Sequence, residues 1–294
     1  METVLSYKDK QVIISPDQPF VIIGERINPT RRKKLAESMA QGDFSVALED
    51  ARKQVEAGSQ VLDVNAGIPG GDEPTLLSGA VQAVMEFAQA PICIDTANPD
   101  ALAAALAVYP GKALINSTTA EAKMMEKVFP LAKQYGAAVI GVITDESGIP
   151  ATPEARLAVA EKLIKRAGDY GIPPQDIVID CLALTVGADH TAGRTTLDTM
   201  QLVQKELGVN LSLGASNVSF GLPDRKIINV AYLALGVARG LTAAITDPTV
   251  PEIQTTLLAT DLLMGRDEYS MHWIQAFRKR DKAAKAAAAA AVGA

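Results

Sequence analysis

Acidic and carboxamide side chains follow a series of short β-branched segments along this 294-residue sequence. Seven of the eight segments end on such a group, and the residues are Glu25, Asp63 with Asn65, Asp95, Asn116, Asp180, Asn217 and Asp247. Ionised carboxylates only accept hydrogen bonds, whereas a carboxamide both donates and accepts. Because buried carboxylates are costly without partners, a set of them at one site favours a ligand that supplies donors. These side chains predict a polar, planar ligand rich in N–H groups.

Other interpretations of the same residues stay open. Asp63, Asp95 and Asp180 could hold a divalent cation, since hard cations take oxygen ligands, but no fixed spacing supports such a site and we expect no bound metal. Each acid alone could cap a helix or pair with a neighbouring strand. A phosphate ligand fits poorly, because the segment ITDPTVPE at 245–252 lacks the glycines of a barrel phosphate site.

The two cysteines and two histidines form no metal-binding or nucleophilic pattern. We expect Cys93 and Cys181 to be packing thiols within strands, with Cys93 on the side of Asp95 and Cys181 facing away from the side of Asp180. His190 lies in the loop segment VGADHTAGR, and we expect it to be solvated, with an acid role at the site as the alternative. We expect His272, beside the single tryptophan, to be a packing residue.

The elements that must position these side chains alternate between strand and helix. We expect strands at 20–25, 60–65, 91–96, 113–118, 137–143, 177–182, 211–217 and 243–247. Segments with helical spacing, such as 46–57, lie between them, and Pro or capping residues mark helix starts at 98–99, 152–153, 223–224 and 249–251. Eight such units in about 250 residues predict an α/β fold, a single (β/α)8 TIM barrel, with its active site at the carboxyl ends of the strands. A doubly wound open sheet is the alternative.

The chain shows one continuous domain. No linker or repeat interrupts the alternation, so we expect one barrel over 1–265 and a helical or disordered tail over 266–294.

Composition limits the partners that we expect. The net charge of −6, from 28 Lys and Arg against 34 Asp and Glu, and an aromatic content of 4% argue against nucleic acid as a partner. We find no hydrophobic signal core and no apolar run near the ~18 residues of a membrane span. We therefore expect a cytoplasmic protein without a membrane partner.

Six motifs occur in order on the predicted strands and their carboxyl ends. They are GERIN at 24–28, DVNAG at 63–67, IDT at 94–96, INSTT at 115–119, the strand ending at Asp180, and SNVSFGLP at 216–223. Over residues 20–265 the sequence resembles the methyltetrahydrofolate:corrinoid protein methyltransferases, a pterin-binding family that is similar to the folate-binding module of cobalamin-dependent methionine synthase. The resemblance implies a (β/α)8 barrel, a homodimer, and a role in one-carbon metabolism. It also implies methyl transfer between N5 of tetrahydrofolate and the cobalt of a corrinoid carried by a partner protein.

Carried over by position, the resemblance assigns roles to the strand-end residues. It implies that Asp95, Asn116 and Asp180 hold the pterin ring and that Asn217 is the catalytic residue, reaching N5. The remaining motif residues are expected to line the pocket or organise its mouth: Asp63, Asn65, Glu25, Arg26 and Asn28. Arg26 could instead be a counter-ion for the acidic ring.

Two related functions are alternatives to methyl transfer. Dihydropteroate synthases share the barrel and would be expected to show a lysine near the end of strand seven and Arg-x-His after strand eight, where this chain has Asn217 and Thr246-Asp247-Pro248. A non-catalytic pterin-binding module would keep the ring-binding residues without needing Asn217. In the segment DHTAG the Asp and His are adjacent, unlike a D-x-H-x-x-G corrinoid motif, so we expect cobalt to arrive on a separate carrier protein.

Overall fold

The computed structural model describes residues 1–292, and its centre is a parallel barrel. Neighbouring strands pair in the order β10-β3-β4-β5-β6-β7-β8-β9. Their bounds are β3 (Val21–Ile27), β4 (Val61–Val64), β5 (Ile92–Asp95), β6 (Leu114–Thr119), β7 (Ala138–Val142), β8 (Ile177–Asp180), β9 (Leu211–Ser212) and β10 (Ala243–Thr246). A parallel bridge between Gly214 and Ile245 joins the two ends of the sheet, with the Ile245 N–H donating to the Leu213 carbonyl at 2.9 Å. The predicted (β/α)8 barrel is confirmed, and the open sheet is wrong.

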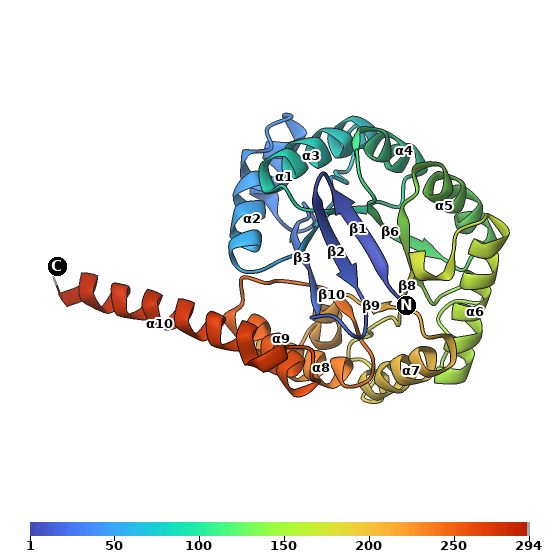
Figure 1. Ribbon diagram of the computed structural model, residues 1–294. Coiled ribbons are helices and arrows are strands. Elements are labelled where there is room, and N and C mark those ends of the chain that lie inside the picture. Colours follow the sequence, from blue (N-terminus) through green and yellow to red (C-terminus); the bar gives the residue numbers. More distant parts are fainter. Residues whose placement is uncertain (293–294) are drawn as a thin grey trace.

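Helices surround the strands as an outer ring (Figure 1). They are α1 (Lys33–Ala40), α2 (Ser45–Glu56), α3 (Glu73–Ala88), α4 (Pro99–Val108), α5 (Ala122–Tyr135), α6 (Pro153–Asp169), α7 (Ala192–Leu207), α8 (Arg225–Val237) and α9 (Pro251–Leu263). Local signals set several starts: the Asn98 side chain accepts from the Asp100 N–H at 3.0 Å, and the Thr152 hydroxyl accepts from the Ala155 N–H at 3.2 Å. Across the described residues, no helix has the length and apolar character needed to cross a bilayer.

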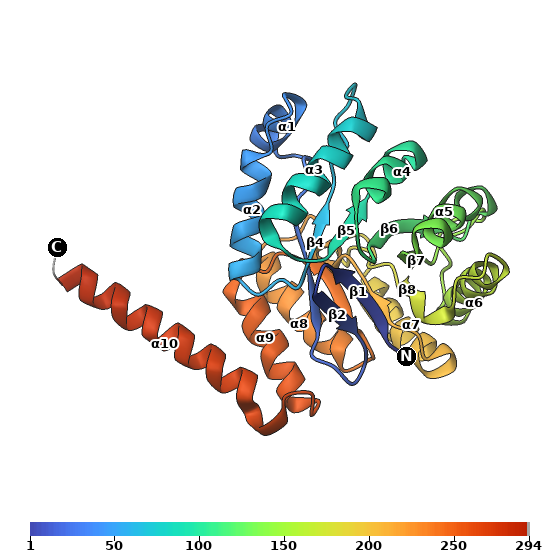
Figure 2. The same cartoon turned by 45° about the horizontal axis from the view of Figure 1, so that its top comes forward.

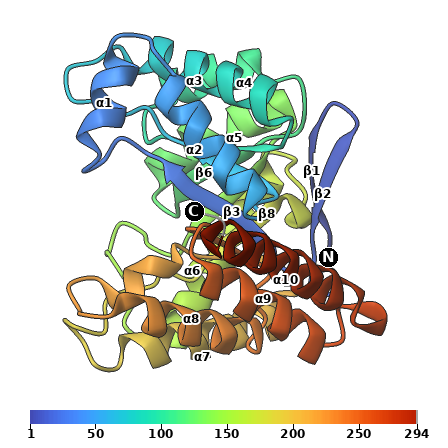
Figure 3. The ribbon, with the colours of Figure 1, turned by 90° about the vertical axis from the view of Figure 1, so that its left-hand side faces the viewer.

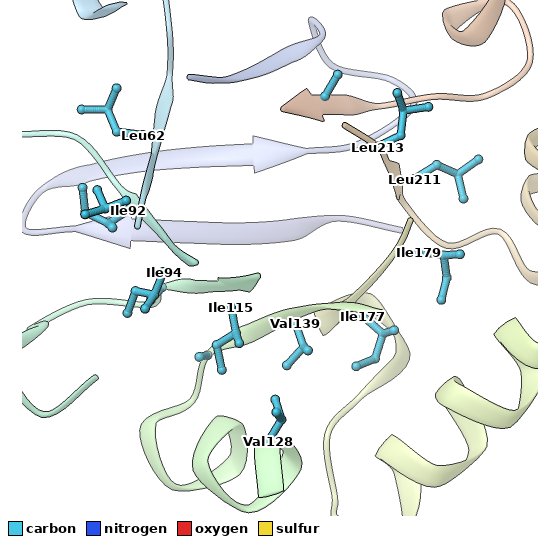
Figure 4. Packing of buried hydrophobic residues seen from close by; sticks show 14 of the residues in the cluster. Leu62, Ile92, Ile94, Ile115, Val128, Val139, Ile177, Ile179, Leu211 and Leu213 are labelled. Atoms are coloured by element: carbon cyan, nitrogen blue, oxygen red, sulfur yellow. The ribbon is translucent and has the colours of Figure 1, made fainter. Parts of the chain in front are cut away.

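Buried side chains form two layers on opposite faces of the strands. The inner layer fills the barrel and includes Cys93, whereas Cys181 belongs to the outer layer between strands and helices, as predicted from their alternation. Figure 4 shows members of the outer layer, such as Ile94 and Val139 on the strands and Val128 on α5. This alternation turns one set of strand-end side chains into the barrel and the other set towards the helices.

An amino-terminal hairpin that the sequence analysis did not predict closes the amino end of the barrel. Its strands β1 (Thr3–Tyr7) and β2 (Lys10–Ile14) are antiparallel and stand apart from the ring of helices (Figure 3). Leu5 and Ile14 are fully buried in the inner layer. The Asn210 amide donates to the Ile14 carbonyl at 2.7 Å and to the Thr3 hydroxyl at 2.9 Å. The hairpin therefore acts as a plug, and the carboxyl end remains the accessible end of the barrel.

The seventh barrel strand is shorter than predicted. Strand pairing was expected over 211–217, but β9 ends at Ser212 and the chain then forms the short helix η2 (Ala215–Ser219). The Asn217 N–H donates to the Gly214 carbonyl at 3.2 Å, which turns the chain out of the sheet. Asn217 therefore lies on a 3-10 turn beyond the strand.

In the carboxyl-terminal segment, the short turn η3 (Glu268–Ser270) leads into one long helix, α10 (Met271–Val292). This helix projects away from the barrel (Figures 1 and 2). A similar short turn, η1 (Pro174–Asp176), precedes β8. Within the predicted tail, 266–294, residues 268–292 form η3 and α10; residues 293–294 lie outside the described residues, and the domain division at 265 stays a prediction. The packing role predicted for His272 is wrong: its side chain is 56% exposed and its Nδ1 lies 3.5 Å from an Asp267 carboxylate oxygen.

Candidate functional site

The predicted site residues gather at the carboxyl end of the barrel. A cavity of about 460 Å³ opens there, which we call the mouth cavity, and its volume is in the range of small-molecule sites. Nine of the predicted residues line it: Glu25, Arg26, Asn28, Asp63, Asp95, Asn116, Asp180, Asn217 and Asp247. Asn65 is not part of the wall and acts through a neighbour.

Two carboxamide–carboxylate hydrogen bonds hold the floor of the mouth cavity. Asn65 Nδ2 donates to Asp95 Oδ2 at 3.1 Å, and Asn116 Nδ2 donates to Asp63 Oδ1 at 3.1 Å. Burial raises the pKa of Asp95 to about 6, against the lowering effect of the Asn65 amide. Burial and the nearby Asp95 charge raise the pKa of Asp63 well above its ordinary value. Asn65 and Asp63 therefore orient Asp95 and Asn116.

Asp180 is anchored from behind by the loop that follows β8. Its Oδ1 accepts from the Leu182 N–H at 2.7 Å, and Leu182 has a left-handed φ of 53° that ends the strand. Arg156 on α6 donates to the Cys181 carbonyl at 3.1 Å and fixes the same loop. Burial raises the pKa of Asp180 to about 6, partly offset by the Leu182 N–H and by Arg156. Within residues 1–292 no hydrogen bond uses its second carboxylate oxygen, which leaves that oxygen for a ligand.

Asn217 stands exposed at the rim, on a turn that Arg225 fixes. Arg225 Nη2 donates to the Ser216 carbonyl at 2.6 Å and its Nε donates to the Ser219 hydroxyl at 3.0 Å. Gly214 allows the amide to lie close to the strand end, because a Cβ there would be 2.9 Å from Asn217 Nδ2. The backbone of the turn is therefore fixed, while the Asn217 side chain remains open to the cavity.

Glu25 enters the mouth cavity from an irregular end of β3. The register shifts between Gly24 and Ile27, and a Cβ on Gly24 would lie 2.5 Å from Gln54 Oε1, which accepts the Arg26 N–H at 2.9 Å. Burial raises the pKa of Glu25 to about 7, and the charge of Asp247 acts in the same direction.

Arg26 is paired with an acid at the rim. Its Nη1 lies 3.0 Å from Asp247 Oδ2, which agrees with the counter-ion interpretation. Asn28, also in the wall, accepts the Thr30 N–H at 2.9 Å and so shapes the loop after β3.

Five further residues of the wall were not predicted as site residues from the sequence: Thr30, Arg32, Gly214, Ser216 and Ile245. Ile245 precedes Asp247 by two positions, the spacing of side chains on one face of a strand, so it could have been found. Ser216 belongs to the SNVSFGLP motif. Thr30 and Arg32 come from a loop whose path over the mouth cavity depends on an Arg32–Asp50 ion pair of 2.6 Å, which no local pattern reveals.

Among residues 1–292, no group of three or more His, Cys, Asp or Glu side chains could hold a metal ion. Burial and the adjacent Asp63 raise the pKa of Cys93 well above its ordinary value, which keeps that thiol protonated. His190 is exposed on its loop.

Comparison with known proteins assigns the chain to a family. Residues 24–247 match the model of pterin binding enzymes. The chain is 28% identical over 266 residues to a methylcorrinoid:tetrahydrofolate methyltransferase of Eubacterium limosum, a match covering 88% of this chain and 97% of the relative. It is also 28% identical over 270 residues to a methionine synthase of Mycobacterium tuberculosis, covering 85% of this chain and 23% of that larger protein.

Solved structures share the fold. A dihydropteroate synthase of Yersinia pestis, solved with a pterine-sulfa conjugate, superimposes with a TM-score of 0.68 over 89% of this chain and 98% of its own. Only 14% of the aligned residues are identical, so this likeness concerns the barrel alone.

Proposed function

Because the chain belongs to the pterin-binding enzyme family, as its motifs predicted, we propose that it is a methyltransferase acting between folate and a corrinoid. It moves a methyl group between N5 of tetrahydrofolate and the cobalt of a corrinoid carried by a partner protein. The similarity to a methylcorrinoid:tetrahydrofolate methyltransferase over 97% of that relative supports this choice.

The observation that carries the proposal is the convergence of Asp95, Asn116 and Asp180 on one cavity. The 2-amino and N3–H edge of a pterin offers two parallel donors, which suit a single carboxylate. Asp180 presents such a carboxylate, while Asp95 and Asn116 are available to the remaining ring N–H and carbonyl groups. Charge-assisted hydrogen bonds of this kind are short and directional, so they would fix the plane of the ring.

Asn217 is the residue that we assign to the reacting nitrogen. When the methyl group leaves N5 for Co(I), the bonding pair stays on N5, and a tertiary amine leaves poorly unless N5 gains a proton or a strong hydrogen bond. The Asn217 amide can donate to N5 and stabilise the charge that changes there. Its exposed position at the rim leaves the methyl carbon open to a large corrinoid from outside the barrel.

We propose a cytoplasmic homodimer that works with a separate corrinoid carrier protein, and that uses folate as a substrate with no metal bound to this chain. Sedimentation of the purified protein measures the oligomeric state, and a monomer would contradict this part alone.

A dihydropteroate-synthase-like activity is the second candidate because of the shared barrel. The position of the expected strand-seven lysine is taken by Asn217, and Thr246-Asp247-Pro248 replaces the expected Arg-x-His. The chain thus lacks the lysine and the Arg-x-His sequence expected of a dihydropteroate synthase, which favours the methyltransferase.

The decisive test is transfer itself, followed by visible spectroscopy of free cobalamin. Mixing the protein with 5-methyltetrahydrofolate and cob(I)alamin should convert the cob(I)alamin spectrum to that of methylcobalamin, and tetrahydrofolate with methylcobalamin should give the reverse change. Folate binding without transfer in either direction would indicate the non-catalytic module. Consumption of a pterin pyrophosphate ester would indicate the synthase.

A further inference from the structure

A second hollow adjoins the mouth cavity. This side cavity, of about 240 Å³, lies between the start of α8, the η2 turn, the end of β10 and the start of α9. Glu25, Ser216 and Asp247 line both hollows. Lys226 also lines the side cavity, and its side chain is 49% exposed, so this hollow reaches the surface of the protein. Glu25 therefore stands in the wall between the mouth cavity and a separate route to solvent.

The groups facing Glu25 come from β3, β4, η2, α8 and the loop after β10. Asp247 follows β10, Arg225 begins α8, Arg26 is its neighbour on β3, and Asp63 lies on β4. The Ser216 hydroxyl donates to Glu25 Oε2 at 3.4 Å. Burial and the charge of Asp247 oppose ionisation of Glu25, while Ser216 and the two arginines favour it, and the resulting pKa is about 7. A carboxyl group in this balance can gain or lose a proton near neutral pH.

We propose that Glu25 exchanges the proton of N5 with solvent through the side cavity. This inference rests on the proposed function and names the proton source that Asn217 cannot provide, because a carboxamide does not ionise. From folate to cobalt, the N5–CH3 bond breaks, the new Co–CH3 bond uses the electron pair of Co(I), and the Glu25 carboxyl group gives its proton to N5. The carboxylate then regains a proton from water in the side cavity.

The reverse reaction requires the opposite form of the same group. The N5 lone pair attacks methyl-Co(III), the cobalt keeps the pair of the broken bond, and ionised Glu25 takes the proton from N5. A bound pterin and corrinoid would cover the mouth cavity, so the side cavity would remain as the path for this proton. Glu25 is thus an acid in one direction and a base in the other.

The test is the pH dependence of single-turnover transfer in both directions, with 5-methyltetrahydrofolate and cob(I)alamin or with tetrahydrofolate and methylcobalamin. In the wild type, transfer to cobalt should decline above about pH 7, and transfer to folate should decline below it. Glu25→Gln keeps the size and the hydrogen bond to Ser216 but cannot donate or accept the N5 proton. It should lower the transfer rate in both directions by roughly 10²-fold or more, and it should remove the decline of the rate above pH 7 in one direction and below pH 7 in the other.

Two further variants and a binding measurement exclude a merely structural role. Glu25→Asp retains a titratable group and should restore part of the rate together with a pH limb. Glu161→Gln makes the same charge change at an exposed position of α6 and should leave the profiles unchanged. Calorimetry should give Glu25→Gln a tetrahydrofolate affinity within about threefold of the wild type, since a protonated carboxyl and a carboxamide occupy the wall alike.

The outcomes separate the inference from the proposed function. If Glu25→Gln transfers the methyl group at the wild-type rate and with the wild-type pH dependence, the proposed role of Glu25 is wrong, while the proposed function stands. A folded Glu25→Gln variant whose rate loss is fully explained by weaker folate binding would contradict that role as well. If the wild type transfers no methyl group at any pH, the proposed function fails and this inference fails with it.

Discussion

The polar side chains of the mouth cavity divide into those that face a ligand and those that hold a neighbour. Asn65 is hydrogen-bonded to Asp95, and Asp63 is hydrogen-bonded to Asn116. Replacing Asn65 or Asp63 would therefore act indirectly, through the orientation of Asp95 or Asn116. Asp180 is held by one oxygen only, through the Leu182 N–H. This difference makes Asp180 the residue at which ligand recognition is tested most directly.

Replacing Asp180 with asparagine should weaken folate binding. The Leu182 N–H would retain the amide oxygen of Asp180→Asn, which turns the amide NH2 towards the N–H groups of the ligand. Loss of a charge-assisted hydrogen bond costs about 1.5–3 kcal/mol, or roughly tenfold to over a hundredfold in affinity. Calorimetry with tetrahydrofolate measures this change. Asp169→Asn, at the exposed end of α6, is the charge-matched control, and a folded Asp180→Asn variant with wild-type affinity would remove Asp180 from the site.

Replacing Asn217 with alanine should damage turnover more than binding. Its amide donates to N5 most strongly when charge changes there, so the loss falls mainly on the transition state. Removal of one preorganised donor costs on the order of 10²–10³ in rate. Single-turnover transfer and folate affinity give the two quantities, and Asn217→Asp, which keeps the shape but loses the donor, should behave similarly. A normal transfer rate in Asn217→Ala would mean that Asn217 is only a wall of the cavity.

At the scale of elements, the amino-terminal hairpin stabilises the barrel from the end opposite the site. It covers the inner layer with Leu5 and Ile14 and is tied to the strand region by the Asn210 amide. Gly111 allows this close approach, because a Cβ there would lie 2.0 Å from the Ser6 carbonyl oxygen. The hairpin and the catalytic end are therefore separable in function.

Replacing Asn210 with alanine should lower stability without altering the site. The Ile14 carbonyl and the Thr3 hydroxyl would each lose a buried donor, at a cost of about 1–3 kcal/mol in the free energy of unfolding. Urea unfolding measures this cost, and Gln11→Ala on the exposed face of β2 should stay within about 0.5 kcal/mol of the wild type. Folate affinity should be unchanged below the transition; a large loss of affinity would show that the two ends are coupled.

At the scale of the whole molecule, the buried acids of the mouth cavity lower the stability of the ligand-free protein when they ionise, and a bound ligand can offset this loss. Glu25, Asp95 and Asp180 have pKa values of about 7, 6 and 6, against 4.5, 3.8 and 3.8 for the unperturbed groups. The folded state therefore binds these protons more tightly than the unfolded state. Their contribution to stability is fully present below about pH 4 and is lost as the pH rises through 6 to 7.

The free energy of unfolding of the ligand-free protein should consequently fall between pH 5 and pH 8. A shift of two pKa units corresponds to about 3 kcal/mol per group when fully expressed, and mutual coupling reduces the sum. Thermal and urea unfolding at the two pH values measure the slope, and Asp180→Asn should flatten it. Tetrahydrofolate, whose N–H groups favour the ionised forms of Asp95 and Asp180, should stabilise the protein more at pH 8 than at pH 5. A ligand-free protein that gains stability over this range would contradict the raised pKa values.

The sequence by itself determined the barrel and the side of each strand that carries the site. Alternation of β-branched and helical segments, with capping residues such as Asn98 and Thr152, is a local signal that survives in the structure. Because side chains alternate along a strand, the positions of Asp63, Asp95 and Asp180 also fixed which face they occupy, and parallel pairing brought those ends to one mouth.

Only the tertiary structure decided what each of these side chains can do. The two-residue length of β9 and the turn that carries Asn217 depend on Arg225, a later residue that binds the turn through space. The orienting role of Asn65, the plug formed by the hairpin and the position of Glu25 between two cavities likewise depend on groups distant in the chain. Local patterns express the preferences of neighbouring residues, whereas burial, charge and hydrogen-bond direction are set by atoms that only folding brings together.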